Sequence, residues 1–590
     1  MTIYEEFQKK AKASQKHKAV SWKENTEWQF FTYKEFLERI DNLAIGLTEL
    51  GLSPGDRVAI LSENRPEWSI SDLALNKIRA ISVPIHTTSK LPSIEYILRD
   101  SESKYLIISK KLFKEEYLEK FDLEKIILIS KEKNSQTNND KIILFSDLMQ
   151  TNKQTFNKEE VELNSNQNDN EENLGDEPST TLHFAQDPGT EKEKNNLGDL
   201  ASIIYTSGTT GEPKGVMLSN ANFLSNILAV KKAIRVFPED RFLSFLPLSH
   251  VLERTAGNYV PLFSGALIYY NTDIKELSDN LLYCQPSILI SVPKIFERIY
   301  EKIFAQINKK GGLSKKLFFW SLRSRKSYLE HRIADLIVHR KIRRAFGGRL
   351  RFAVSGGASI NERILKFFSK MKINIIEGYG LTETSPIISC NTLEENKIGT
   401  VGKPMDCLEV KIADDKEILM RGPSLMQGYW NKDNLTEEAI QDTWFHTGDL
   451  GFLDSDSYLS IIGRKKDIIV TSNGKNVAPE KIEGMLNLSP YIDQALVVGH
   501  KQSYLVALFT LDCEKNIDGV CDLDLDAQTN IIKKEVEKIN RDLESYEKIR
   551  RFKILEKSFT IEDGELTPTL KVRRKIIEEK YSDVIEGMYG

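Results

Sequence analysis

The sequence predicts an α/β fold in two parts: a large domain over residues 1–463 and a smaller α+β domain over residues 464–590. Three observations support this prediction. The chain has 590 residues, which exceeds the size at which a single hydrophobic core stops growing. Short apolar runs alternate with segments of helical periodicity through the first part, as in α/β proteins. After about Gly463 the pattern changes to a charged turn, a short strand-like segment and helices.

The individual elements of the large domain follow from apolar spacing. Residues 32–50 have the periodicity of an amphipathic helix, whereas residues 57–61 and 80–84 are short apolar runs. Further strands are predicted over residues 200–205 and 350–354. The strand that ends at residue 205 opens directly into a loop rich in Gly and Thr, which is the first candidate for a functional site.

Two segments of the large domain have unusual compositions. Residues 131–199 are rich in Asn, Gln, Glu, Ser and Thr, too polar to bury a core, and predict a mobile surface insertion. Between residues 301 and 351, fifteen Lys and Arg residues face three acidic ones, with apolar residues at spacings that suit amphipathic helices. This basic amphipathic insertion fits either peripheral contact with an anionic membrane surface or a solvated helical face.

The overall composition narrows the class of protein. The formal charge of −4 is small for this length and gives no indication of a nucleic-acid partner. Five scattered cysteines without CxxC spacing predict reduced thiols in a cytoplasm. The N-terminus lacks the apolar stretch of a secretory signal, and no run approaches the roughly twenty apolar residues of a membrane span. We therefore expect a cytoplasmic protein that meets a membrane only from its inner face.

The segment YTSGTTGEPKG, residues 205–215, has the composition of a triphosphate-binding loop. Its glycines let the backbone approach phosphate oxygens, its hydroxyls donate hydrogen bonds, and Lys214 supplies positive charge. It does not fit the pattern GxxxxGK[ST], because Glu212 follows Gly211 and Gly215 follows Lys214. A P-loop kinase or GTPase is therefore disfavoured, and a Gly/Thr-rich surface turn is the alternative.

The same segment resembles the signature [YST]TSGTTGxPKGV of the adenylate-forming superfamily, which includes acyl-CoA synthetases, luciferases and the adenylation domains of peptide synthetases. Other segments resemble further motifs of that superfamily in the same order: LPLSHVLERT (246–255), SGGA (355–358), EGYGLTET (377–384), WFHTGD (444–449), GRKKD (463–467), SNGKNVAPEKIE (472–483) and LTPTLKVRR (566–574). The resemblance implies a large N-terminal domain of stacked α/β sheets with a distorted β-barrel, and a small mobile α+β C-terminal domain.

The resemblance assigns nucleotide binding to fourteen positions: Thr206, Ser207, Gly208, Thr209, Thr210, Gly211, Lys214, Gly357, Ala358, Tyr379, Gly380, Thr382, Asp449 and Arg464. Within this set Tyr379 would stack on adenine, Thr382 would meet the α-phosphate, and Asp449 would accept hydrogen bonds from both ribose hydroxyls. Thr206 and Glu383 would hold Mg²⁺, which prefers oxygen ligands.

The remaining assignments concern the acyl group, coenzyme A and catalysis. His250 would lie beside the acyl channel, with a hydrogen-bonded core histidine as the alternative. Gly474 and Lys475 would contact CoA, and Lys466 would be the hinge of the C-terminal domain. Lys571 matches the catalytic lysine, which acts together with Thr206 and Glu383, although Lys575 and the adjacent arginines are rival cations.

The activity that the resemblance implies is that of an AMP-forming long-chain fatty acid:CoA ligase. ATP and a fatty acid would give acyl-AMP and pyrophosphate, and CoA would then form the thioester. The LERT segment and the basic insertion are similar to those of long-chain members. Open alternatives are a ligase that uses an acyl carrier protein or another carboxylic acid, a non-catalytic nucleotide- or lipid-binding relative, and a surface lipid-binding module. Both a monomer and a homodimer fit the sequence.

Overall fold

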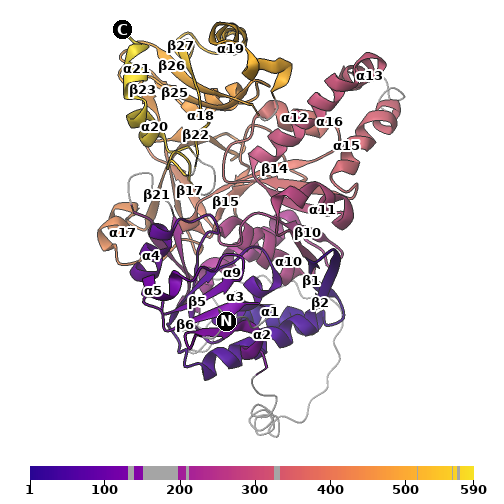
Figure 1. Cartoon of the computed structure of the whole chain (residues 1–590), viewed down its shortest axis with the longest axis vertical. Coiled ribbons are helices and arrows are strands. Elements are labelled where there is room, and N and C mark those ends of the chain that lie inside the picture. The colour runs from indigo at the N-terminus through magenta and orange to yellow at the C-terminus, as the bar shows by residue number, and fades with distance from the viewer. Residues whose placement is uncertain are drawn as a thin grey trace.

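The computed structural model describes residues 1–130, 139–150, 197–206, 212–323, 332–513, 516–560, 562–567 and 572–590. The predicted site residues Ser207, Gly208, Thr209, Thr210, Gly211 and Lys571 lie outside these ranges. Figure 1 shows the N-terminal elements at one end of the molecule and the C-terminal elements β25–β27 and α19–α21 at the other.

An eight-stranded sheet carries the predicted phosphate loop. Its strand order is β19 (Gly428–Tyr429), β9 (Lys214–Ser219), β8 (Leu200–Thr206), β4 (Ile81–Pro84), β3 (Arg57–Leu61), β5 (Tyr105–Ser109), β6 (Lys125–Ile129) and β7 (Ile142–Leu144). Strands β4, β3, β5, β6 and β7 run parallel, β8 joins them in parallel beside β4, and β9 returns antiparallel to β8. The predicted strands at 57–61, 80–84 and 200–205 are thus confirmed.

A nine-stranded sheet forms the second layer. Its order is β16 (Lys403–Pro404), β15 (Ile387–Cys390), β14 (Ile375–Gly380), β13 (Phe352–Ser355), β12 (Ile288–Ser291), β10 (Arg241–Ser244), β11 (Leu267–Tyr270), β1 (Lys18–Glu24) and β2 (Glu27–Thr32). The predicted strand at 350–354 corresponds to β13. Strand β1 pairs in parallel with β11, which brings Val20 beside Ile268.

The main hydrophobic core lies between these two sheets. It contains α3 (Pro66–Lys77), α9 (Asn220–Ile234) and the π-helix η2 (Glu253–Tyr259), together with residues of both sheets. Helix α3 is buried on all sides, as expected of a helix enclosed by two layers. Helices α1 (Ile3–Ala13), α2 (Tyr33–Glu49), α4 (Leu91–Asp100) and α10 (Val260–Ser264) complete this region, and Thr32 caps α2 in a capping box with Glu35.

A smaller five-stranded sheet follows the second layer. Its strands are β17 (Glu409–Ile412), β18 (Glu417–Arg421), β21 (Trp444–Leu453), β20 (Ile440–Gln441) and β22 (Leu459–Arg464), of which β22 pairs with β21. Helix α17 (Asp433–Ala439) precedes β20. The antiparallel pair β21–β22 brings Asp449 beside Arg464.

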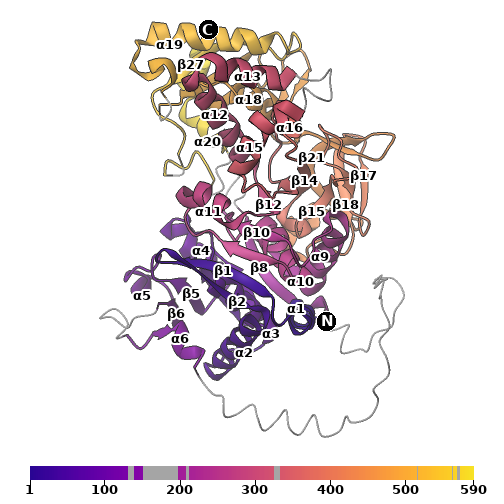
Figure 2. The same cartoon turned by 90° about the vertical axis from the view of Figure 1, so that its right-hand side faces the viewer.

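The predicted amphipathic helices of the basic insertion are present. They are α12 (Pro293–Lys310), α13 (Gly312–Arg323), η4 (Asp335–His339) and α15 (Arg340–Ala345), and α11 (Leu277–Cys284) and α16 (Glu362–Lys370) lie beside them. Their inner faces form an aromatic core in which Phe304, Phe318 and Phe367 contact one another. Figures 1 and 2 show α12 and α13 reaching toward the C-terminal elements.

The C-terminal part has its own hydrophobic core. Strands β25 (Ile492–Val498), β26 (Leu505–Leu511) and β27 (Ile549–Leu555) form a sheet, and a hairpin joins β23 (Ile469–Val470) to β24 (Asn476–Val477). Helices α18 (Pro479–Leu486), α19 (Leu525–Asn540), α20 (Arg574–Lys580) and α21 (Ser582–Gly587) pack on the sheet. The predicted α+β character of this part is therefore present.

Two sequence-based expectations are wrong. Residues 139–150 do not belong to a polar insertion, which the sequence predicted over 131–199, because β7 and α6 (Phe145–Leu148) bury Ile142, Leu144 and Phe145. The apolar run of these elements is short and lies among polar residues, so the composition of the segment did not indicate it. Residues 131–138 and 151–196 lie outside the described ranges. The five cysteines are also not all free thiols, since a chain reversal brings Cys513 and Cys521 together in a disulfide.

Candidate active site

A cleft of about 3400 Å³ lies between the large domain and the C-terminal part. It is lined by twelve of the predicted site residues: Thr206, Lys214, His250, Gly357, Ala358, Tyr379, Gly380, Thr382, Glu383, Asp449, Arg464 and Lys466. Several of these residues follow the carboxyl ends of parallel strands, where open α/β sheets bind their ligands. The structure therefore brings together motifs that are up to about 260 positions apart.

Asp449 is the centre of a polar cluster on one wall of the cleft. Tyr379 donates its hydroxyl to Oδ2 of Asp449 at 2.7 Å, and Nε of Arg464 lies 2.9 Å from Oδ1. Burial raises the pKa of Tyr379 well above its usual value, so the ring carries a neutral hydroxyl. Each carboxylate oxygen can accept more than one hydrogen bond, so both oxygens can also accept hydrogen bonds from the ribose hydroxyls.

Glu383 is held by a tyrosine that sequence reasoning missed. The Tyr429 hydroxyl donates to Oε1 of Glu383 at 2.9 Å, and Nζ of Lys214 lies 5.0 Å from the centre of the Tyr429 ring. Burial, together with the Glu383 charge, raises the pKa of Tyr429 above its usual value. Tyr429 thus connects the predicted metal ligand to the predicted phosphate-binding lysine. The only signal in the sequence is its place in a Gly-Tyr-Trp triplet.

Thr206 and Lys214 face each other across the phosphate loop. They form the last described pair of the β8–β9 ladder, so the loop residues 207–211 connect two strands that are held in register.

The opposite wall of the cleft also needs close backbone packing. A Cβ atom on Gly380 would lie 1.8 Å from the Pro386 carbonyl oxygen, so this position admits only glycine.

His250 lies in the turn that precedes η2. Its backbone N–H donates to the Pro247 carbonyl oxygen at 2.9 Å, and its Nδ1 accepts a hydrogen bond from the Leu252 N–H at 3.2 Å. When the ring is neutral, its proton is therefore on Nε2. His250 is only partly buried and lines the cleft, so the alternative of a core histidine is not supported.

The loop that carries Lys571 is flanked by residues that reach the cleft. Thr567 and Val572 line it on either side of the undescribed residues 568–571. One rival cation also lines the cleft but is already paired, because Arg574 forms an ion pair with Glu483 at 2.8 Å and donates to the Val497 carbonyl oxygen. Burial next to Glu483 makes Arg574 a structural residue of the C-terminal part.

Gly474 and Lys475 do not line the cleft. They lie in the turn between β23 and β24, where Gly474 has a positive φ of 71° and a Cβ atom would meet nothing within 4 Å. Nζ of Lys475 lies 5.8 Å from the centre of the Tyr546 ring. The two residues that the resemblance assigns to CoA are thus separated from the nucleotide residues in this arrangement of the domains.

A second residue to which the sequence assigned no role is Glu377, the first residue of the motif that contains Tyr379. It lines the cleft, although only 8% of its surface is exposed. Burial raises the pKa of its carboxyl to about 7. Its position inside the EGYG motif was visible in the sequence, but its burial depends on neighbours from other elements.

Comparison with known proteins identifies the family. The AMP-binding enzyme model matches residues 7–430, and the AMP-binding enzyme C-terminal domain model matches residues 466–590. The long-chain-fatty-acid–CoA ligase FadD15 of Mycobacterium tuberculosis is 34% identical over 95% of this chain and 93% of its own length. Fatty acyl-CoA synthetase A of Dictyostelium discoideum is 30% identical over 96% of this chain and 86% of its own length.

Solved structures share the fold at low identity. The anthranilate CoA ligase AuaEII in complex with anthranoyl-AMP has a TM-score of 0.73 at 19% identity, covering 100% of this chain and 98% of that one. The adenylation domain of a carboxylate reductase from Mycobacterium chelonae has a TM-score of 0.77 at 20% identity, covering 100% and 91%. With the motifs gathered in one cleft and matching models over both parts, this chain belongs to the AMP-binding enzyme family.

Proposed function

We propose that this protein is a long-chain fatty acid–CoA ligase that works through an acyl-AMP intermediate. The observation that carries the proposal is the common cleft of the nucleotide residues and His250, in a chain whose relatives of that name match it over nearly their full length. Three kinds of group line this cleft. A carboxylate would bind the ribose, oxygen ligands and a lysine would bind the phosphates, and a histidine in a turn would lie beside the acyl group.

In the first half-reaction an oxygen of the fatty acid carboxylate attacks the α-phosphorus of ATP, and the bond from that phosphorus to pyrophosphate breaks. Tyr379 and Asp449 hold the adenosine, while Thr382 donates a hydrogen bond to the α-phosphate. The phosphate-loop residues 207–211, Lys214 and Lys571 stabilise the negative charge that develops on the phosphates. Donors of this kind each contribute on the order of 3 kcal/mol to such transition states.

Thr206 and Glu383 fit a magnesium ion that is shared with the substrate. In the part of the chain that the structure describes, no cluster of three or more His, Cys, Asp or Glu side chains could hold a metal by itself. Mg²⁺ commonly binds through one carboxylate plus substrate phosphates, and the hydrogen bond from Tyr429 orients the Glu383 carboxylate for this task. When bound, the ion would neutralise phosphate charge and polarise the phosphoryl oxygens.

In the second half-reaction the CoA thiol attacks the acyl carbonyl, and AMP leaves. The CoA residues Gly474 and Lys475 lie outside the cleft, whereas the flanks of the Lys571 loop line it. One geometry does not serve both steps. A rotation of residues 467–590 about Lys466 would bring Gly474 and Lys475 into the cleft and withdraw the Lys571 loop from it. The domain limits 1–463 and 464–590 are part of this proposal.

The experiment is formation of AMP and acyl-CoA from ATP, Mg²⁺ and CoA across fatty acids of increasing length, with acetate and an aryl acid as controls. A maximum on long chains is the expected result. Pyrophosphate release without any thioester would indicate a carrier-protein acceptor, and a maximum on the aryl acid would indicate another substrate class. No turnover with any acid would support a nucleotide- or lipid-binding relative.

A second proposal is peripheral contact of the basic insertion with an anionic membrane. Within the described ranges, no helix combines the length and apolar character that a membrane crossing requires. Leu313 is 81% exposed and Leu336 is 60% exposed, on α13 and on the adjacent η4. Exposed cations lie near them in the sequence: Lys309, Lys310, Lys315, Lys316, Arg340, Lys341 and Arg344. Apolar side chains among cations are typical of helices that bind an anionic lipid surface.

A further inference from the structure

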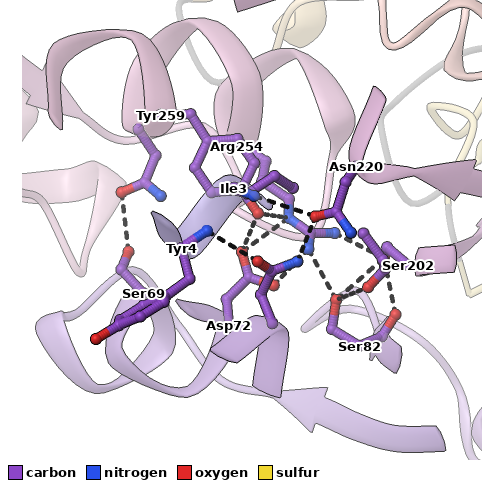
Figure 3. Close-up of polar contacts among 12 residues, drawn as sticks. Ile3, Tyr4, Ser69, Asp72, Ser82, Ser202, Asn220, Arg254 and Tyr259 are labelled. Atoms are coloured by element: carbon purple, nitrogen blue, oxygen red, sulfur yellow. Dashed lines mark hydrogen bonds and ion pairs between the residues drawn. The ribbon is translucent and has the colours of Figure 1, made fainter. Parts of the chain in front are cut away.

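A buried ion pair between Arg254 and Asp72 lies in the core beneath the cleft. Both side chains are only 1% exposed. Nε of Arg254 donates to Oδ2 of Asp72 at 3.0 Å and to the Tyr259 hydroxyl at 3.0 Å, and Nη2 donates to Oδ1 of Asp72. Figure 3 shows this guanidinium among its partners.

The same guanidinium also reaches the sheet that carries the phosphate loop. Nη1 donates to Oγ of Ser202 on β8 at 2.7 Å, and Nη2 donates to Oγ of Ser82 on β4 at 2.7 Å. Ser202 in turn donates to the Ser82 carbonyl oxygen at 2.7 Å. One cation therefore connects η2, α3, β4 and β8 (Figure 3). Because the guanidinium is planar and rigid, these contacts fix direction as well as distance.

Two of the elements that Arg254 connects, β8 and η2, adjoin predicted site residues. Strand β8 ends at Thr206, and alternation along the strand puts the side chains of Ser202 and Thr206 on the same face. On the other side, the Arg254 backbone N–H donates to the His250 carbonyl oxygen at 3.1 Å. The next residue, Thr255, donates its hydroxyl to the Ser385 carbonyl oxygen at 3.2 Å, just beyond Glu383.

A contribution to stability does not by itself explain why an ion pair is buried at this position. Burying two charges costs several kcal/mol per ion, and well-packed apolar residues in place of a buried ion pair are often neutral or stabilising. What apolar side chains would not supply is a directional link between the His250 turn and the phosphate-loop strand. In-line attack on phosphorus needs such a link, because a displacement of about 1 Å can lower a rate on the order of a hundredfold.

We propose that Arg254 is a positioning residue for the adenylation step, an inference that rests on the ligase function proposed above. Through Asp72, Ser82 and Ser202 it sets the separation between the His250 turn, where the acyl carboxylate lies, and the strand that ends at Thr206. It touches neither substrate. Its loss misaligns the carboxylate and the α-phosphorus while the adenosine contacts at Asp449 persist.

The test compares two kinds of variant with the wild type, whose turnover in the acid series establishes the ligase function separately. The double variant Arg254→Met with Asp72→Leu removes both charges and keeps apolar volume. We expect its melting temperature to stay within a few degrees of the wild type and its kcat for pyrophosphate release to fall on the order of a hundredfold. The KM for ATP should change by less than about threefold, and supplied acyl-AMP should still react with CoA.

The milder variant Ser202→Ala keeps the ion pair and removes its link to β8, together with the hydrogen bonds between Ser202 and Ser82. Ser69→Ala is the matched control, because Ser69 is also a buried serine, bonded to Asn258 and Tyr270 rather than to Arg254. We expect kcat to fall about tenfold for Ser202→Ala and to stay within twofold for Ser69→Ala. Equal effects of the two alanine variants, or losses that simply follow the fraction of folded protein, would overturn the inference. The comparison of Ser202→Ala with Ser69→Ala tests the inference even if the double variant does not fold.

Discussion

The carboxylate of Asp449 is held on both oxygens by side chains of this chain, Tyr379 on one and Arg464 on the other. Its geometry is therefore set before it receives a ribose. The same contact matters for Asp449 itself, because its carboxylate is only 6% exposed and a buried charge needs a partner, whereas the Arg464 side chain is 41% exposed. Substitutions at Asp449 and at Tyr379 separate the contribution of the Asp449 charge from that of its hydrogen bonds.

Asp449→Asn keeps the shape of the side chain and removes its charge. We expect the KM for ATP to rise by about tenfold or more, because the ribose loses an anionic acceptor and Arg464 loses its partner. Tyr379→Phe removes one hydrogen bond to Asp449 and keeps the aromatic face, so a rise of about fivefold is expected. Steady-state kinetics with ATP varied at saturating fatty acid measure both. A larger effect for Tyr379→Phe would contradict the assigned roles.

Glu377 predicts a pH-dependent stability. Its folded-state pKa is raised from 4.5 to about 7 by burial, so the folded protein keeps a proton that the unfolded chain releases between these values. Stability from this group is fully present below about pH 4.5 and is lost as pH rises through about 7. The difference is on the order of 3 kcal/mol at pH 8.

The measurement is the melting temperature of Glu377→Gln relative to the wild type from pH 5 to pH 8. The variant should be more stable at pH 8, and the advantage should shrink toward pH 5. Glu437→Gln is the control, because Glu437 is exposed and its charge is not among the causes of the raised Glu377 pKa, so its variant should show no such trend. An advantage that is constant across the pH range would show that Glu377 is not the titrating group.

Among the elements, the helices of the basic insertion expose leucines that the fold itself does not need. Leu313→Asn with Leu336→Asn should weaken binding to anionic vesicles about tenfold per leucine, because each buried leucine contributes about 1.5–3 kcal/mol to partitioning. Phe452→Ser is the control, since Phe452 is 50% exposed on β21, away from the basic insertion. Cosedimentation with anionic and neutral vesicles measures the effect.

High salt should release the wild type from anionic vesicles, because part of the attraction is electrostatic. Equal binding by the leucine variant and the wild type would reject the membrane proposal and leave the basic insertion as a solvated surface. Turnover of a water-soluble short acid should be the same in all of these variants.

Elements with a clear apolar period could be predicted from the sequence, and those without one could not. Helix α2 was found because polar and apolar residues alternate with its turns, whereas α3 was missed because it is buried on all sides and carries buried polar residues such as Ser69 and Asp72. The same holds for the site. Motif residues are local in sequence, but Tyr429 and the Arg254 pair act through contacts with distant segments.

For the whole molecule, the arrangement of two domains around one cleft predicts that the two half-reactions can be separated. Lys466→Pro restricts the backbone at the proposed hinge. We expect acyl-AMP formation to stay within a few-fold of the wild type and thioester formation to fall at least about a hundredfold. Single-turnover assays of pyrophosphate release and of acyl-CoA from supplied acyl-AMP measure the two steps. Equal loss of both would refute the hinge.

The pairing of β1 with β11 has a consequence for biosynthesis. Val20 and Ile268 are partners in the sheet although about 250 residues separate them in the chain. At about 5–20 residues per second, the ribosome needs roughly 12 to 50 s to deliver the second strand after the first. Throughout that interval β1 has an unpaired edge, which is a template for pairing with other chains. The yield of folded protein should therefore depend on growth temperature and on chaperones that bind nascent chains.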